Sequence, residues 1–288
     1  MTCIVRVSPD HRRKRRCFER ASKNMEKDMA DLNTRPSAPI ENDTIAIQLG
    51  HRTIRAFTDK ALTEEELTTL FEVARQTASS SFLQQCTILR ITDPEVREKL
   101  HQASGQPYVG GTKGELLVFV ADQYRNARIR EEAGIEDTPL HTVNLLLTAL
   151  HDALLSAQNV VVAAESMGLG TCYLGSIHAN PELVSEALNL PKLTFPVLGL
   201  LIGHPDQSPQ YKPRLPLSVT VADNTYPCLD SYEEALAEYD QTITEYYDLR
   251  ATSKRVESFS TLVRTKVGIG GAHVSDILGV IHKQGFDL

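Results

Sequence analysis

The sequence lacks the short motifs that would identify a catalytic or metal centre at once. It has no phosphate-binding P-loop, no zincin histidine pair and no serine nucleophile elbow, and its nine histidines show no ligand spacing. Its five cysteines are scattered, odd in number and never arranged as C-x-x-C, so they indicate neither a disulfide framework nor a zinc site. We therefore expect no metal centre and a reducing, cytoplasmic setting.

Segments of secretory or membrane type are also missing. There is no leading apolar segment of signal-peptide type, and no uninterrupted apolar run approaches the length of a membrane span. Within the most apolar stretch, residues 140–167, the side chains of Asn144, His151, Asp152 and Gln158 would each be costly in hydrocarbon. A membrane partner is therefore not expected.

Residues 140–167 instead predict the helix around which the rest of the chain is built. A helix that is apolar on nearly all sides is buried and needs cover on more than one face, so part of its surface could form a subunit contact. Gly168 can take the left-handed backbone conformation that ends such a helix. The apolar stripe that recurs at three- and four-residue spacing comprises Val143, Leu147, Leu150, Leu154, Val161 and Ala164.

Charge is unevenly distributed along the chain. The formal net charge is −7, yet residues 1–35 contain ten Lys and Arg against five Asp and Glu, a net of +5, which leaves −12 for the remainder. The basic run at residues 11–16 could bind nucleic acid weakly, with a dissociation constant on the order of 10⁻⁴ to 10⁻⁶ M, but the acidic remainder opposes this. We interpret residues 1–40 as a flexible basic extension, or as a segment upstream of a start at Met25 or Met29.

Capping and periodicity signals predict long helices interleaved with four or five short strands, which is an α+β pattern or α/β with a mixed sheet. Further helices are expected over residues 43–49, from the capping box of Thr63 and Glu66, and over residues 94–103, 181–188, 231–247 and 274–284. Strands are expected over residues 87–91, 115–121, 171–177, 195–203 and 217–222. No repeat or long linker divides residues 41–288, so we interpret them as one domain.

Several segments suit a phosphorylated, planar ligand. A phosphomonoester carries about −1.5 to −2 charges at neutral pH and requires cations and further donors. His51, Arg52 and Arg55, together with Lys212 and Arg214, could supply them. Each signal also has a plainer interpretation, because an arginine pair is usually a solvated face and K-P-R is usually a turn.

Other segments could meet the ring of such a ligand. The serine triplet at residues 79–81 and Gln106 offer short donors and acceptors, although a serine triplet is usually a plain loop. Gly175 would let backbone amides approach an aromatic ring. Gly168, Gly170 and Gly175 are spaced G-x-G-x₄-G after a helix, which does not fit the G-x-G-x-x-G fingerprint of dinucleotide-binding folds.

In combination these segments resemble the nitroreductase family, in particular its NADPH-dependent, FMN-containing nitroreductases and flavin reductases. The resemblance implies an intertwined, FMN-binding homodimer with a central, mostly antiparallel sheet flanked by helices and two flavins at the interface. The matching segments occur in the family's order and cover residues 45–255: HRTIRAFTD (51–59), SSSFLQ (79–84), SGQPYV (104–109), AAESMGLGTCYLGSI (163–177), PVLGLLIGHP (196–205), KPRLP (212–216) and EYYDLR (245–250).

The resemblance also implies roles for individual residues. The FMN phosphate, ribityl chain and pyrimidine edge would be met by His51, Arg52, Thr53 and Arg55, with Lys212 and Arg214 closing the phosphate site. The flavin ring would be lined by Ser79, Ser80, Ser81, Phe82 and Gln106, with Tyr173, Leu174, Gly175 and Ser176 along its far edge. The extra phosphate of NADPH would face Arg250, with Lys254 or Arg255. Departures from residues common in the family occur at Thr53, Ser176 and His178 and leave the choice between NADPH and NADH open.

In the mechanism that the resemblance implies, the flavin carries the redox chemistry and no side chain is a certain catalytic group. NADPH reduces the flavin and leaves, and a nitroaromatic, a quinone or free flavin then reacts in the same open site, in ping-pong order. The Gly175 amide near N5 and Arg55 near the N1/C2 edge would tune the ring. Two alternatives stay open: an FMN enzyme of the same fold with oxidase or dehalogenase-like chemistry, and a flavin-binding scaffold whose basic arm contacts nucleic acid.

Overall fold

The computed structural model of this chain describes residues 33–248, 257–266 and 275–287, which divide into two compact units. The larger unit contains residues 51–209 and 275–287, and the smaller unit contains residues 33–50, 210–248 and 257–266. Most of the basic extension predicted for residues 1–40 lies outside the described residues. A single domain over residues 41–288 stays a prediction.

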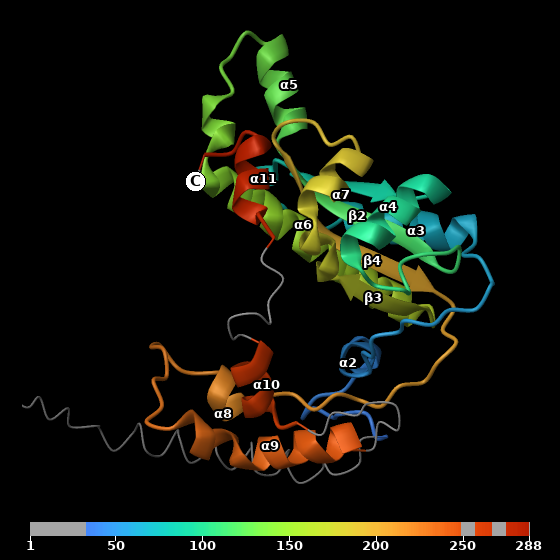
Figure 1. Ribbon diagram of the computed structural model, residues 1–288, viewed down its shortest axis with the longest axis vertical. Coiled ribbons are helices and arrows are strands. Elements are labelled where there is room, and N and C mark those ends of the chain that lie inside the picture. Colours follow the sequence, from blue (N-terminus) through green and yellow to red (C-terminus); the bar gives the residue numbers. More distant parts are fainter. Residues whose placement is uncertain (1–32, 249–256, 267–274, 288) are drawn as a thin grey trace, which may run out of the picture. The chain divides into compact units, whose positions relative to one another are not determined.

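A four-stranded antiparallel sheet forms the centre of the larger unit (Figure 1). Its strands are β1 (Cys86–Arg90), β2 (Glu115–Asp122), β3 (Gly170–Leu174) and β4 (Thr194–Gly203), in the spatial order β1, β2, β4, β3. The two most apolar strands, β2 and β4, take the two central positions because a central strand is covered on both faces. The sheet and its helices confirm the predicted α+β class.

Side chains of β2 alternate between two hydrophobic cores, as the two-residue period of a strand requires. One core contains Leu117 and Phe119, together with residues of α3 (Glu64–Arg75) and α6 (Val143–Ser166). The other contains Leu116 and Val118, together with residues of α4 (Pro94–Ser104) and α7 (Pro181–Ala187). Helices therefore cover both faces of the sheet.

The long helix α6 packs on the sheet through small residues, which allow a close approach. Part of the apolar stripe predicted to be buried is instead exposed within the larger unit, although Val161 and Ala164 are buried as predicted. Val143, Leu147, Leu154 and Leu155, here called the apolar face of α6, are 38% to 52% exposed. By length and composition α6 could cross a membrane, yet 44% of its most apolar window is buried inside the protein. The residues that it does bury include Ala149, Ala153, Ser156, Ala157, Val160 and Ala164.

The predicted helix boundaries follow local capping chemistry. The Asn42 side chain accepts from the amide of Ile45 and opens α2 (Asp43–Leu49) in the smaller unit. In the larger unit the capping box of Thr63 and Glu66 opens α3, as predicted. Gly168 has a φ of 77°, the left-handed conformation expected where α6 ends.

The structure corrects two predicted strands and adds two α-helices. Residues 217–222, expected to be an edge strand, begin with the short helix α8 (Leu217–Thr220), and Leu215 and Val219 pack four residues apart against α9 (Tyr232–Asp248). The predicted strand 171–177 stops at Leu174, where the chain turns into the 3₁₀ helix η3 (Gly175–Ala179). Two helices were not predicted, α5 (Tyr124–Glu132) and α10 (Phe259–Lys266); α5 buries only Ala127 and so has no apolar stripe to read.

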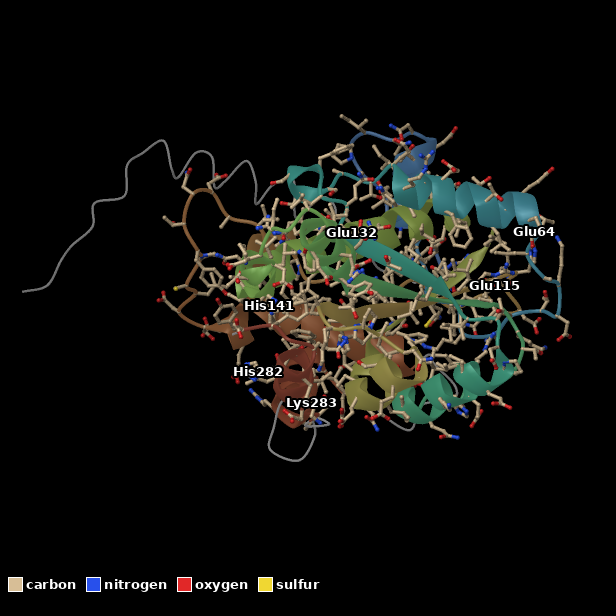
Figure 2. The ribbon with its side chains drawn as sticks, turned by 90° about the horizontal axis from the view of Figure 1, so that it is seen from above. Glu64, Glu115, Glu132, His141, His282 and Lys283 are labelled. Carbon is tan, nitrogen blue, oxygen red and sulfur yellow. The ribbon has the colours of Figure 1, made fainter. Side chains whose placement is uncertain are left out.

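The C-terminal helix α11 (Ile277–Lys283) closes one end of the larger unit. The Lys283 ammonium contacts Glu182 Oε1 at 2.5 Å, and Nε2 of the Gln284 side chain donates to the carbonyl of Thr194 at 2.9 Å. His141, from η2 (Thr138–His141), lies on the same side of this unit (Figure 2) and is bonded through Nδ1 to the carbonyl of Gly285 at 2.6 Å. The last described residues thus belong to the packed core rather than to a free tail.

Candidate functional site

The cationic segment at residues 51–57 runs beside the start of β3. Thr53 forms a parallel bridge with Thr171, and the amide of Ile54 donates to the Thr171 carbonyl at 2.8 Å. The fit is tight, because a Cβ added at Gly170 would lie 2.7 Å from Cγ1 of Ile54. Phe57 pairs with Pro205 at the far end of the segment. The cations of this segment are therefore carried by a rigid backbone.

Three polar side chains meet where α6 ends. Nδ1 of His51 lies 2.7 Å from Oε1 of Glu165, and the Thr171 hydroxyl donates to the same oxygen at 2.7 Å. The His51 and Glu165 side chains are partly buried, 29% and 13% exposed. This arrangement fixes the orientation of the His51 ring.

The two arginines of the segment point to different neighbours. Nη1 of Arg52 donates to the Ser208 hydroxyl at 3.0 Å and to the Pro209 carbonyl at 3.3 Å. The exposed Arg55 guanidinium lies 5.7 Å from the centre of the Tyr108 ring, a cation–π distance. Tyr108 shares the loop after α4 with Gln106, so this contact brings two of the predicted segments together.

That loop is held in place by Arg97 of α4. Its guanidinium donates to three backbone carbonyls, those of Val109 at 2.9 Å, Lys113 at 2.8 Å and Gly114 at 2.8 Å. Burial lowers the pKa of Arg97 from its usual value, and three charge-assisted bonds offset this desolvation. Gln106 and Tyr108 are thus presented by an ordered loop.

The end of β3 offers an open backbone surface. A Cβ added at Gly175 would meet nothing within 4 Å, whereas the side chain of Leu174 lies in the core, so Leu174 can offer a ligand only its backbone. The Tyr173 hydroxyl donates to Gln158 at 3.0 Å, and burial raises the pKa of Tyr173. The Ser176 hydroxyl oxygen is buried and has no hydrogen-bond partner in the part of the chain that the structure describes. A ligand that bonds to this hydroxyl would satisfy it.

The serine loop forms a second group around Asp152 of α6. This carboxylate, only 4% exposed, accepts from the Ser79 hydroxyl and from the backbone amides of Ser80 and Gln85, each at 3.0 Å. Ser81 and Phe82 have φ values of 51° and 59°, in the left-handed region that favours glycine. The exposed Phe82 side chain, 81% accessible, projects from this strained loop.

The predicted site residues therefore fall into groups. Within the larger unit, residues 51–55, Gln106 with Tyr108, and residues 171–176 form one group, and no hydrogen bond among the described residues joins it to the serine loop. Lys212 and Arg214 are exposed residues of the smaller unit, before α8. The predicted NADPH-phosphate residues Arg250, Lys254 and Arg255 lie outside the described residues.

Sequence reasoning missed the residues that support these groups. In the sequence Asp152 stands out only as a polar interruption of an apolar helix, and no pattern singles out Glu165 or Arg97. A carboxylate on the small-residue face of an apolar helix is a usable signal, because a buried charge requires donors. Nothing in the local sequence indicates the partners of Glu165.

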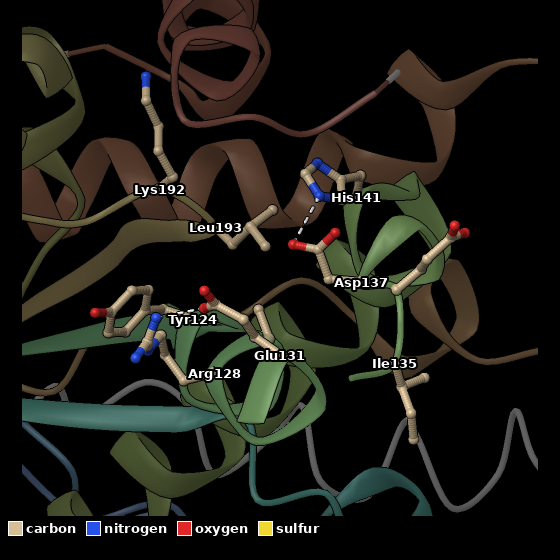
Figure 3. A pocket seen from close by; sticks show the side chains of 10 residues that line it. Tyr124, Arg128, Glu131, Ile135, Asp137, His141, Lys192 and Leu193 are labelled. Atoms are coloured by element: carbon tan, nitrogen blue, oxygen red, sulfur yellow. Dashed lines mark hydrogen bonds and ion pairs between the residues drawn. The ribbon is translucent and has the colours of Figure 1, made fainter. Parts of the chain in front are cut away.

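A surface hollow of about 420 Å³ lies elsewhere in the larger unit, beside α5 and η2 (Figure 3). Most of the charged groups that line it are engaged: Arg128 with Glu131, His141 with Asp137, and Lys192 with the carbonyl of Lys283. None of the predicted ligand-binding residues lines it. We therefore do not assign the chemistry to this hollow.

Comparison with known proteins gives a consistent result. The Nitroreductase family matches residues 49–204, and the Nitroreductase family C-terminal domain matches residues 212–288. An FMN reductase (NADPH) of Bacillus subtilis is 41% identical over 222 residues, covering 76% of this chain and 89% of that protein. An oxygen-insensitive NADPH nitroreductase of Salmonella typhimurium is 39% identical, covering 84% of this chain and 98% of that protein.

Solved structures show the same similarity. The NfrA1 nitroreductase of B. subtilis has a TM-score of 0.77 and 37% identity, covering 84% of this chain and 98% of that one. An NADPH:FMN oxidoreductase of Vibrio harveyi, solved as a complex with NAD⁺, has a TM-score of 0.75 and 37% identity, covering 85% and 99%. In both cases the similarity covers nearly the full length of the solved protein.

Proposed function

This chain belongs to the nitroreductase family, and we propose that it is an FMN-dependent oxidoreductase that takes reducing equivalents from NADPH and passes them to small aromatic acceptors. The proposed acceptors are nitroaromatics, quinones and free flavin, and the proposed location is the cytoplasm, where NADPH is available. The observation that carries the proposal is the cationic segment at residues 51–55, fixed along the start of β3, the strand whose other end leads into the open backbone at Gly175.

The residues present fit FMN. Its phosphate requires cations and donors, which His51 and Arg52 provide on one rigid segment. Its ring requires backbone without a side chain in the way, so that the ring can lie close, and polar groups at its edge. Gly175 offers the first and the unpartnered Ser176 hydroxyl the second. Arg55, above Tyr108, supplies a positive charge for the pyrimidine edge.

The proposal assigns the remaining predicted residues as follows. Thr53, Gln106 and Tyr173 line the ribityl chain and the ring, together with the backbone of Leu174. Lys212 and Arg214, which follow Pro209 by three and five residues, complete the phosphate site. Arg250, with Lys254 or Arg255, binds the extra phosphate of NADPH.

FMN, when bound, supplies the reversible two-electron chemistry that links NADPH oxidation to reduction of an acceptor. The protein's own residues bind the phosphate, orient the ring and leave one side open for a large cofactor. The Gly175 amide can donate a hydrogen bond to the ring without a proton-transferring side chain. A site that is open to successive ligands suits ping-pong kinetics and permissive acceptor choice.

A second copy of the chain completes the site in this proposal. The serine loop, with Ser79, Ser80, Ser81 and Phe82, makes its polar contacts to Asp152 rather than to the first group of site residues. Close by, the apolar face of α6 exposes leucines that a partner would cover. A homodimer in which each serine loop faces the partner's flavin accounts for both features.

Purified full-length protein tests the proposal directly. It should be yellow, release FMN on denaturation and lose its flavin absorbance when NADPH is added without oxygen. Steady-state rates with NADPH and NADH against a nitroaromatic, a quinone and FMN would then establish the acceptor range. A colourless protein that takes up no added FMN would refute the proposal, and a flavin that NADPH does not bleach would favour oxidase or dehalogenase-like chemistry.

A further inference from the structure

A carboxylate lies unexpectedly close to the proposed phosphate-binding cations. Glu165, in the last turn of α6, accepts through one oxygen from His51 Nδ1 and from the Thr171 hydroxyl, both at 2.7 Å. Negative charge beside an anion site weakens anion binding by simple Coulomb repulsion. The position of Glu165 therefore needs a reason beyond charge.

The hydrogen-bond chemistry supplies that reason. An ionised carboxylate only accepts hydrogen bonds, so Nδ1 of His51 must carry a proton. Nε2, on the opposite edge of the ring, has no hydrogen-bond partner among the residues that the structure describes. The pair thus turns one ring nitrogen inward and leaves the other available to a ligand.

Thr171 makes the arrangement rigid. Its hydroxyl donates to Glu165, while its backbone pairs with Thr53 and accepts from the amide of Ile54. One residue of β3 therefore fixes both the carboxylate and the segment that carries His51. A ring held at its backbone and at Nδ1 loses little further freedom when a ligand binds.

We infer that Glu165 is a positioning residue, which holds His51 so that Nε2 donates to the phosphate of the bound flavin. The inference rests on the proposed function, because it requires FMN at this site. With Nδ1 protonated, Nε2 can donate only from the imidazolium form. In this arrangement Glu165 accepts from one ring nitrogen and the phosphate from the other, while Arg52 adds a neighbouring positive charge.

Glu165→Gln separates this role from simple repulsion, because the two effects have opposite signs. Repulsion predicts tighter FMN binding once the charge is removed, whereas positioning predicts weaker binding. We expect the FMN dissociation constant of the apo-protein to rise about tenfold. Riboflavin, which has no phosphate, should bind as before, so the preference for FMN over riboflavin should fall.

Matched variants define the control. Asp137→Asn removes the carboxylate of another His–acid contact in the same unit, 3.4 Å from His141, and should leave both flavins unaffected. Thr171→Val removes the hydroxyl that donates to Glu165 with little change of shape, and it should also lower the preference for FMN over riboflavin. In a His51→Ala background, Glu165→Gln should no longer lower that preference, because only the relief of repulsion is left.

A readout without flavin checks the mechanism itself. In ¹⁵N-histidine-labelled apo-protein, the His51 nitrogen shifts should report a protonated Nδ1, and Glu165→Gln should move them. The inference is wrong if Glu165→Gln leaves the preference for FMN over riboflavin unchanged, if it raises that preference, or if it weakens the binding of both flavins equally. If the unaltered protein binds neither flavin, the proposed function fails instead.

Discussion

Asp152 shows how a single side chain can hold a strained loop in place. Its buried carboxylate accepts from the Ser79 hydroxyl and from the amides of Ser80 and Gln85. Left-handed backbone at non-glycine residues such as Ser81 and Phe82 costs about 1–2 kcal/mol each. The hydrogen bonds to Asp152 offset this cost and set the direction in which Phe82 projects.

Asp152→Asn tests this role. The amide group of asparagine would face backbone donors where an acceptor is required, so we expect a loss of about 1–3 kcal/mol in the free energy of unfolding, measured with urea. Ser79→Ala removes one donor and should cost less. An Asp152→Asn protein as stable as the original would show that the carboxylate does not hold the loop.

The phosphate assignment of Lys212 and Arg214 is also tested at the residue scale. Reversing both charges, Lys212→Glu with Arg214→Glu, places anions against a dianion and should weaken FMN binding by about 100-fold or more. Lys60→Glu with Lys99→Glu makes the same change in net charge at exposed positions of the larger unit and serves as the control in flavin titrations. Equal affinity of the two double variants would mean that the phosphate lies elsewhere.

At the scale of secondary-structure elements, each helix is ended by local chemistry but oriented by packing. The capping box of α3 joins Thr63 and Glu66 reciprocally. The hydrogen bond from the Thr63 amide lowers the pKa of Glu66 below its ordinary value of 4.5. A lowered pKa stabilises the folded state above pH 4.5, and that contribution is lost as the pH falls through the folded-state pKa.

Thr63→Ala should therefore destabilise the larger unit by about 1 kcal/mol, seen as a lower urea midpoint. Thr68→Ala, at an exposed position inside the same helix, should leave the midpoint nearly unchanged. For Glu66→Gln we expect the largest loss of folding stability near neutral pH and a smaller loss below pH 4.5. A stability difference that does not shrink on acidification would contradict the assigned cause.

At the scale of the whole molecule, we expect the apolar face of α6 to form the subunit contact of the proposed dimer. Within one copy its small residues pack on the sheet, and Leu147, Leu154 and Leu155 stay accessible. Apolar side chains of this size, exposed together on one long helix, are typical of a subunit contact. The serine loop is hydrogen-bonded to Asp152 of the same helix, so we expect assembly and flavin binding to be linked.

Leu154→Glu with Leu155→Glu should convert the proposed dimer to monomer, because two charges would be buried without partners. Sedimentation velocity would measure this, and the monomer should also retain less FMN. Ile129→Glu, on the exposed side of α5, is a control of similar polarity change. A dimer that survives the double substitution would place the subunit contact on another surface.

The sequence by itself determined what depends on near neighbours: the caps at Asn42 and Thr63, the helix end at Gly168 and the apolar strands β2 and β4. It also carried the segments by which the family was identified. These signals can be read from the sequence because they arise from residues only a few positions apart.

The tertiary structure alone decided which face of α6 is buried, and that residues 217–220 form a helix, because both depend on what packs against them. It also decided the partners of the polar side chains. Glu165 meets His51 across 114 residues, and Asp152 meets Ser79 across 73. No local pattern encodes such pairs, since they exist only once the sheet has brought its helices together.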